Sequence, residues 1–277
     1  MIAPAWPSSR KIARTAFESS SVASGWRQVP EEVPIAFSFY GTTHAVMMAT
    51  PADLEDFATG FCLSEGIVGS AIEIETINIV PVTDGIDLQV TLAADARARL
   101  KVRRRQMAGP VGCGLCGIES IEEVMRPLPS LGRATPSFTA EDITRAAALL
   151  ARQQPMNDQT RAMHAAGFYT PGGGVIAARE DVGRHNALDK LAGHLARNGH
   201  VGSTGAVVVT SRVSVEMVQK TAIIGAPLLI AISAPTALAL DVAERAGLSV
   251  AALVRGDSFE LFTHPGRIRN GQPIHVA

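Results

Sequence analysis

Two cysteines three positions apart are the residues of this sequence best suited to chemistry. Cys113 and Cys116 form a Cys-x-x-Cys pair within GPVGCGLCG, and the chain of 277 residues has only three cysteines in all. Such a pair can be a redox couple, half of a zinc site, or a carrier that passes sulfur on. Because the thiolate is the reactive form in each case, the surroundings of the pair decide its use.

The residues around the pair favour a reactive thiolate on a movable loop. Arg103–Arg105 precede it and would add positive charge if the predicted loop folds back. A short helix predicted over 118–128 would stabilise a thiolate at its N-terminus through its dipole. Glycines at 109, 112, 114 and 117 give the segment freedom to swing, as a delivery arm requires.

A zinc site would need two ligands besides Cys113 and Cys116. The sequence offers no second cysteine pair and its seven histidines are scattered, so we expect no metal ligands in this chain. A thioredoxin-type redox pair belongs at a strand–helix junction without this basic, glycine-rich approach. From the residues alone, thiol redox chemistry and sulfur carriage both stay open.

Polar residues follow three apolar strands predicted in the C-terminal half. Ser211 and Arg212 follow the strand 205–210, Ser233 closes the strand 227–233, and Arg255–Asp257 follow the strand 249–254. Ligands of open α/β sheets bind at the carboxyl ends of strands, and the helix N-termini there suit phosphate groups. We therefore expect a ligand-binding rim at this edge, the alternative being ordinary caps and turns.

A further polar cluster lies in EDVGRHNALDK, at a predicted helix start. It contains Asp181, His185 and Asn186. His185 shares a helical face with Leu188 and Ala192, so a histidine satisfied within the core is the alternative to a binding role. No G-x-G-x-x-G follows a predicted strand and no G-x-x-x-x-G-K-[ST] occurs, which disfavours standard Rossmann and P-loop nucleotide sites.

The composition describes a globular protein of a reducing compartment. Hydrophobic residues make up 47% and charged residues 18%, and the formal net charge of −1 gives no bulk attraction to nucleic acid or anionic membranes. Few cysteines and the absence of a signal peptide indicate the cytosol. The uncharged stretch 221–240 carries two prolines and a glycine, so it predicts a buried strand–turn–helix instead of a membrane span.

The order of predicted elements gives an α/β fold in two domains. Residues 1–30 are Ser/Arg/Ala-rich and predict a poorly ordered leader. Residues 31–135 predict a smaller β-rich domain that carries the Cys-x-x-Cys loop, 103–117. Residues 136–277 predict a larger α/β domain, whose three strands named above alternate with amphipathic helices and are expected to run parallel.

Local patterns predict the elements of the smaller domain and its junction with the larger one. A β-hairpin is expected about Tyr40-Gly41, followed by a helix capped by Thr50 whose core face ends at Cys62. Cys62 is therefore expected to be core packing. Further strands are expected over 72–82 and 85–94, an amphipathic helix over 137–154, and a polar loop over 157–160.

Long segments of the chain resemble the formate dehydrogenase accessory sulfurtransferases, the FdhD-type proteins. The resemblance is carried by EEVPIAFSFYGTTHAVMMATPADLEDFATGFCLSEGIV, RRRQMAGPVGCGLCGIE, REDVGRHNALDK, SRVSVEMVQKTA and SAPTALALDVAERAGL. These segments span about residues 30 to 265 in the family's order. The resemblance implies a cytoplasmic homodimer with a cytidine-deaminase-like C-terminal domain.

The resemblance also implies a function and the residues that perform it. Such proteins receive sulfur from a cysteine desulfurase as a persulfide, which corresponds to Cys113 here, with Cys116 assisting. They pass the sulfur to the molybdenum (or tungsten) bis-guanine-dinucleotide cofactor, a substrate without a permanent site, before its insertion into formate dehydrogenase. The family's cofactor-binding segment corresponds to Leu253, Val254, Arg255, Gly256, Asp257 and Ser258. A zinc or thiol-redox protein and a non-catalytic cofactor-binding chaperone are the alternatives.

Overall fold

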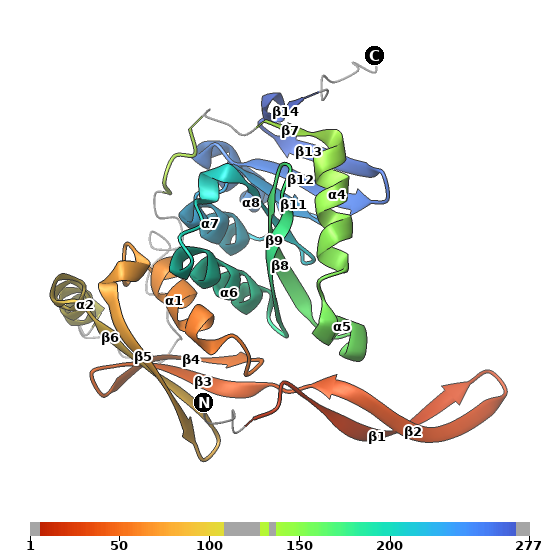
Figure 1. Ribbon diagram of the computed structural model, residues 1–277, viewed down its shortest axis with the longest axis horizontal. Helices are drawn as coiled ribbons and strands as arrows, with labels where there is room; N and C mark the ends of the chain where they lie inside the picture. Colours follow the sequence, from red (N-terminus) through yellow and green to blue (C-terminus); the bar gives the residue numbers. More distant parts are fainter. Residues whose placement is uncertain (1–5, 108–127, 133–136, 270–277) are drawn as a thin grey trace.

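The computed structural model describes residues 6–107, 128–132 and 137–269, without the side chains of 101–107 (Figure 1). Two larger sheets are formed by these residues, and each has a hydrophobic core of its own. The four-stranded sheet belongs to the N-terminal half and the six-stranded sheet to the C-terminal half. The expected α/β fold with a smaller β-rich part is therefore confirmed.

The four-stranded sheet has the order β4-β3-β6-β5. Its strands are β3 (Val33–Phe39), β4 (Thr42–Ala49), β5 (Ile74–Val82) and β6 (Gly85–Leu92). The hairpin between β3 and β4 is confirmed, since Tyr40 and Gly41 both have positive φ, as tight hairpin turns require. The alternate β3 residues Ile35, Phe37 and Phe39 are fully buried beneath helix α1.

Helix α1 (Leu54–Ser64) supplies the other half of this core. The predicted core face, from Leu54 to Cys62, is buried, and the rings of Phe37 and Phe61 stack with centroids 4.0 Å apart. Thr50 does not cap the helix as expected: the N-cap residue is Asp53. Thr50 instead hydrogen-bonds across to the C-terminal half, which takes it out of the helix.

The six-stranded sheet has the order β13-β12-β11-β10-β8-β9, with β10, β11 and β12 parallel as expected. Its strands are β8 (His164–Thr170), β9 (Gly174–Asp181), β10 (Ala206–Val209), β11 (Leu228–Ala231), β12 (Ser249–Arg255) and β13 (Ser258–Thr263). The stretch 221–240 forms the end of a helix, a buried strand and the start of the next helix.

Helices cover both faces of this sheet, giving three layers (Figure 1). Val207 and Val209 face the core beneath α6 (Arg184–Arg197), α7 (Val215–Ile224) and α8 (Ala237–Ala246). Ala206 and Val208 face α4 (Ala140–Ala151). Because side chains alternate along a strand, a strand buried on both faces is apolar throughout, as the sequence of β10 is.

The two halves are joined where α1 crosses α6 (Figure 1). Glycines make the crossing close: a Cβ atom at Gly60 would lie 1.7 Å from the backbone oxygen of Asp189. A Cβ atom at Gly193 would lie 1.9 Å from the backbone oxygen of Asp56. Any larger residue at either position would force the helices apart, so the sequence fixes how closely the two sheets approach.

The prediction of a poorly ordered leader was wrong for residues 9–30. They form a hairpin of β1 (Ser9–Glu18) and β2 (Ser21–Pro30) that projects from the body (Figure 1). Its backbone groups pair with each other, and Arg27 anchors its base by donating to the backbone oxygen of Thr160 at 3.2 Å. Because both faces are largely exposed, the strands lack the apolar alternation by which strands are recognised in a sequence.

Two other local expectations were wrong. Residues 157–160, expected as a polar loop, belong to α5 (Pro155–Thr160), where the proline at the first helical position favours a helix start. Arg103–Arg105, expected in a loop, fall within α2 (Ala94–Met107). The helix expected over 118–128 lies almost entirely outside the described residues.

Shorter elements complete the described chain. These are η1 (Ala71–Glu73), β7 (Phe138–Thr139), η2 (Gly202–Thr204), η3 (Pro265–Arg267) and β14 (Ile268–Arg269). The expected helix over 137–154 is confirmed as α4, which begins with a reciprocal capping box between Thr139 and Asp142. Among the helices that the structure describes, none has the length and apolar character needed to cross a bilayer.

Candidate functional site

The carboxyl ends of β10, β11 and β12 meet at one edge of the six-stranded sheet, as the sequence predicts. The backbone N–H of Ile232 donates to Val209 at 3.0 Å, which joins the first two strand ends. The backbone N–H of Leu253 donates to Ser233 at 3.3 Å, and Arg255 donates to the backbone oxygen of Ile232. The polar residues that follow the three strands therefore lie along one rim.

The end of β12 departs from regular strand geometry. Leu253 has a φ of 57°, in the left-handed region that costs a leucine about 1–2 kcal/mol, and the pairing with β13 shifts register between Ala252 and Arg255. Val254 is buried at the same point. Strained backbone of this kind is concentrated at ligand sites, so the conformation of Leu253 supports a functional assignment of this segment.

The turn beyond Leu253 presents polar groups to solvent. Arg255, Gly256, Asp257 and Ser258 are all exposed, and Gly256 has a positive φ of 54°. The Ser258 hydroxyl donates to the backbone oxygen of Arg255 at 2.9 Å, which closes the turn. The Asp257 carboxylate and the Arg255 guanidinium are thus displayed on a tight turn at the rim.

The residues after β10 and β11 divide into buried and exposed ones. Ser211 is buried and its hydroxyl donates to the backbone oxygen of Arg212 at 3.1 Å, while the side chain of Arg212 is exposed. Ser233 is partly buried. Arg212 and Ser233 are therefore accessible to a ligand on the rim, whereas Ser211 shapes the backbone beneath it.

Asp181 and Asn186 lie inside the protein, where their side chains are hydrogen-bonded to other residues. Asp181 is fully buried and accepts from the backbone N–H of Thr50 at 3.0 Å, from Lys190 at 2.6 Å and from Asn186 at 2.9 Å. Asn186 also donates to the backbone oxygen of Met48 at 2.9 Å. The expected cofactor contact of this pair is replaced here by a role in joining β4 to the start of α6.

His185 is half-buried and points toward α7. Its Nε2 lies 3.1 Å from Oε2 of Glu216, in the first turn of that helix. Burial lowers the pKa of His185 below 6.5, and the Glu216 carboxylate partly opposes this by favouring the charged imidazolium. Of the three EDVGRHNALDK residues predicted for the site, His185 is the one that is partly exposed.

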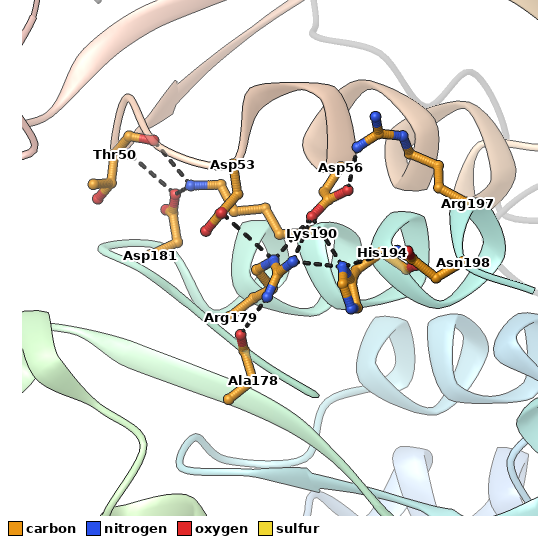
Figure 2. A network of polar contacts seen from close by, with 10 residues as sticks. All are labelled: Thr50, Asp53, Asp56, Ala178, Arg179, Asp181, Lys190, His194, Arg197 and Asn198. Carbon is orange, nitrogen blue, oxygen red and sulfur yellow. Dashed lines mark hydrogen bonds and ion pairs between the residues drawn. The ribbon is translucent and has the colours of Figure 1, made fainter. Parts of the chain in front are cut away.

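A network of charged groups lies between α1 and α6, and sequence analysis did not find it (Figure 2). Asp56 accepts from Arg179 at 2.7 Å and from Arg197 at 2.6 Å. Arg179 also donates to Nδ1 of His194 at 2.5 Å, so this ring nitrogen is the unprotonated acceptor. Burial, followed by the charge of Arg179, lowers the pKa of His194.

Another buried pair continues this interface deeper in the core. Lys220 of α7 donates to both carboxylate oxygens of Asp189 at 2.6 Å, and Ser64 of α1 donates to the same group at 2.6 Å. The sequence pattern does not reveal this contact, because Asp189 and Lys220 lie on helix faces that are otherwise apolar and buried. The signal in the sequence is a charged residue at an apolar position of an amphipathic helix, which demands a buried partner.

The three cysteines differ in what the structure says of them. Cys62 is fully buried in the core, as expected, and burial raises the pKa of its thiol far above its usual value. Cys113 and Cys116 lie outside the described residues. Within the described part of the chain, no group of three or more His, Cys, Asp or Glu side chains is placed to hold a metal ion.

Comparison with known proteins gives the chain a family. Residues 30–269 match the FdhD/NarQ family. The chain belongs to that family. It is 57% identical to the sulfur carrier protein FdhD of Agrobacterium fabrum, with 94% of this chain and 96% of the relative covered. It is 55% identical to the protein of the same name from Brucella abortus, with 94% and 97% covered.

A solved structure of the same fold agrees with this family membership. A crystal structure described as that of a formate dehydrogenase accessory protein from Desulfotalea psychrophila superposes with a TM-score of 0.76. The two sequences are 25% identical, and the match covers 95% of this chain and 100% of the other. The residues matched by the FdhD/NarQ family, 30–269, include both the four-stranded and the six-stranded sheet.

Proposed function

We propose that this chain is a sulfurtransferase required for formate dehydrogenase activity. It takes sulfur from a cysteine desulfurase as a persulfide on Cys113 and transfers it to the molybdenum (or tungsten) bis-guanine-dinucleotide cofactor. The cofactor then enters formate dehydrogenase. The observation that carries the proposal is the 57% identity, over almost the whole chain, to a protein named a sulfur carrier.

The first step is a thiol–persulfide exchange. The Cys113 thiolate attacks the terminal sulfur of the desulfurase persulfide, the S–S bond of the donor breaks, and the desulfurase cysteine leaves as a thiolate. Cys113 then carries one additional sulfur as Cys113–S–SH. Sulfur moves without a net change in oxidation state, so this step requires no external oxidant.

The second step releases the sulfur toward the cofactor. Attack of the Cys116 thiolate on the Cys113 sulfur forms a disulfide between the two residues and expels the outer sulfur as hydrosulfide. A cellular dithiol reductant must then reduce the disulfide before the next cycle. In an alternative sequence, Cys116 relays the outer sulfur itself; both sequences require Cys113.

The rim of the six-stranded sheet is the proposed cofactor site. Asp257 is exposed on the β12–β13 turn, and a carboxylate can accept hydrogen bonds from two ring N–H groups of guanine. Arg255 and Arg212 carry the positive charge that the cofactor's phosphates require, and Ser233 and Ser258 offer hydroxyl donors. The strained Leu253 holds this turn in its place at the end of β12.

The partners and setting that we propose are those implied by the resemblance to the FdhD-type proteins. A cysteine desulfurase supplies sulfur, formate dehydrogenase receives the finished cofactor, and the chain acts as a homodimer in the cytoplasm. The chain's low net charge of −1 agrees with protein and small-molecule partners in preference to nucleic acid.

Replacement of Cys113 by alanine tests the proposal in cells that lack the chromosomal gene. We expect Cys113→Ala to abolish formate dehydrogenase maturation, while Cys62→Ala, which removes a thiol buried in the core, retains it. Full maturation by Cys113→Ala would favour a cofactor-binding chaperone whose cysteines only guard the site. Stoichiometric zinc in the purified protein, lost in Cys113→Ala, would favour the zinc alternative.

A further inference from the structure

Two polar side-chain atoms are buried without a partner at the same end of the six-stranded sheet as the rim. Nε of Arg184 and Oγ of Ser214 have no hydrogen-bond partner among the described residues. Arg184 is the first residue of α6, and Ser214 precedes α7 without capping it through its side chain. Since nearly all buried polar groups of native proteins are hydrogen-bonded, these two call for an explanation such as a ligand.

The starts of these two helices lie together, beside the carboxyl end of β10. His185 of α6 and Glu216 of α7 approach to 3.1 Å. His164, the first residue of β8, pairs in register with the last residue of β9, three positions before Arg184. The next residue, Ala165, donates its backbone N–H to the hydroxyl of Thr210 at 3.0 Å, directly after β10. His164 and the adjacent pair Arg184 and His185 therefore lie on neighbouring ends of β8 and α6, beside the carboxyl end of β10.

Arg184 supplies the positive charge of this cluster, because the lowered pKa values of His164 and His185 leave both rings neutral near pH 7. Burial and then the charge of Arg184 lower the pKa of His164, which Asp181 partly opposes. His185 also feels Arg184, together with Glu216, Lys220 and Asp189. Among the described residues, no carboxylate forms an ion pair with Arg184.

The two buried acidic groups nearby are already paired with lysines. Asp181 is paired with Lys190 at 2.6 Å and Asp189 with Lys220 at 2.6 Å, so neither carboxylate is free to pair with Arg184. Glu216 is half-exposed, and its ion-pair partner among the described residues is His185. A guanidinium that has no carboxylate partner among the described residues, and that lies near two histidines, favours a negatively charged ligand.

We propose that Arg184, His164 and His185 bind an oxyanion of the phosphate class beside the carboxyl end of β10. The backbone N–H groups at the starts of α6 and α7 add donors and a favourable helix dipole. The Arg184 Nε and the Ser214 hydroxyl gain the partners that the protein itself does not give them. The inference extends the proposed function: the anion is either a phosphate of the nucleotide cofactor or a free phosphate.

A titration of the full-length chain tests this directly. Inorganic pyrophosphate is added while the ring resonances of the histidines are followed by NMR. The bound anion compensates the charge of Arg184, so we expect saturable shifts and a higher pKa for His164 and His185. The ring of His200, beyond the far end of α6, should not respond. Unchanged resonances of His164 and His185 at millimolar pyrophosphate would overturn the proposal.

A pair of arginine variants gives an independent readout. Arg184→Gln should weaken pyrophosphate binding by about ten- to a hundredfold, the value of one or two charge-assisted hydrogen bonds. Arg152→Gln, at an exposed arginine after α4, is the control and should leave the affinity unchanged. Equal pyrophosphate affinity in the wild type and in Arg184→Gln would contradict the assignment.

Guanosine diphosphate distinguishes the two sources of the anion. If the nucleotide binds more tightly than pyrophosphate and Arg184→Gln weakens both, the cluster holds a phosphate of the cofactor. If the two ligands bind equally and Arg184→Gln weakens both, the cluster holds a free phosphate. If Arg184→Gln binds the nucleotide as the wild type does, the inference fails while sulfur transfer stands. If the protein binds pyrophosphate through Arg184 but gains no sulfur from a desulfurase, the anion site stands and the proposed sulfur transfer fails.

Discussion

The ammonium of Lys190 lies 2.6 Å from a carboxylate oxygen of Asp181, and both side chains are fully buried where α6 meets the end of β4. The same ammonium donates to the backbone oxygen of Thr50 at 2.9 Å (Figure 2). One ion pair therefore links the segment before α1 to the six-stranded sheet. Because α1 and α6 carry the junction of the two halves, this pair fixes how the halves meet.

Removal of one partner of this pair should destabilise the fold strongly. Lys190→Met leaves the Asp181 carboxylate buried without its counter-charge, and we expect a loss of about 3–5 kcal/mol in the free energy of unfolding. Lys11→Met, at an exposed lysine of β1, should change it by less than about 0.5 kcal/mol. Urea unfolding followed by circular dichroism measures both, and equal midpoints would contradict the role given to the pair.

The close crossing of α1 and α6 predicts a second sensitive position. In Gly193→Ala the new methyl group would meet the backbone oxygen of Asp56, so we expect a loss of about 1–3 kcal/mol. Gly266→Ala is the matched control, since a Cβ atom there meets nothing within 4 Å. Thermal unfolding of the two variants should separate them, and a stabilised Gly193→Ala would show that the helices can part without cost.

The interface should also respond to pH through His194. The fold lowers the pKa of His194 below 6.5, so the unfolded chain binds this proton more tightly. The contribution of neutral His194 to the free energy of unfolding is fully present above pH 6.5. It is lost as the pH falls from 6.5 through the folded-state pKa. Burial lowers the pKa of His164 and His185 too, so these residues act in the same direction.

The measurement is urea unfolding at about pH 7.5 and about pH 5.5. We expect the wild type to be less stable at the lower pH, and His194→Gln to lose part of this difference because the side chain no longer titrates. An identical difference in the variant and the wild type would show that other groups cause it.

The thiol of Cys62 should resist alkylation in the folded protein. It is fully buried and its pKa is raised, so the reagent cannot reach the sulfur and the reactive thiolate does not form. The double variant Cys113→Ala/Cys116→Ala leaves Cys62 as the sole cysteine. We expect iodoacetamide to label this variant only in denaturant. Stoichiometric labelling in native buffer at about pH 8 would disprove the protection.

Much of the fold could be predicted because hydrophobic periodicity reports burial. The all-apolar β10 and the i, i+3, i+4 pattern of α1 each gave the correct element and core face. The β1–β2 hairpin was missed since exposed strands such as Ser9–Glu18 bury nothing and leave no pattern. Thr50 was misjudged for a related reason: its partners lie about 130 residues away in sequence, at Asp181 and Val182.

In the candidate site too, local sequence patterns predict some features, whereas others depend on partners distant in sequence. The convergence of Ser233, Leu253 and Arg255 follows from the parallel order of three strands, which the alternation of strands and helices indicates. The burial of Asp181 could not be predicted, because an acidic residue near a helix start is equally compatible with a cap, a ligand-binding residue or one partner of an ion pair. Only the approach of Lys190 from the next turns decides among these.

The proposed carriage of sulfur by Cys113 is tested most directly by mass spectrometry. The purified chain is incubated with a cysteine desulfurase and cysteine, and the peptide containing residues 113–116 is analysed under non-reducing conditions. We predict a mass gain of one or more sulfur atoms that is absent from Cys113→Ala and present in Cys62→Ala. A peptide that gains no sulfur in the wild type, or gains it equally in Cys113→Ala, would contradict the account.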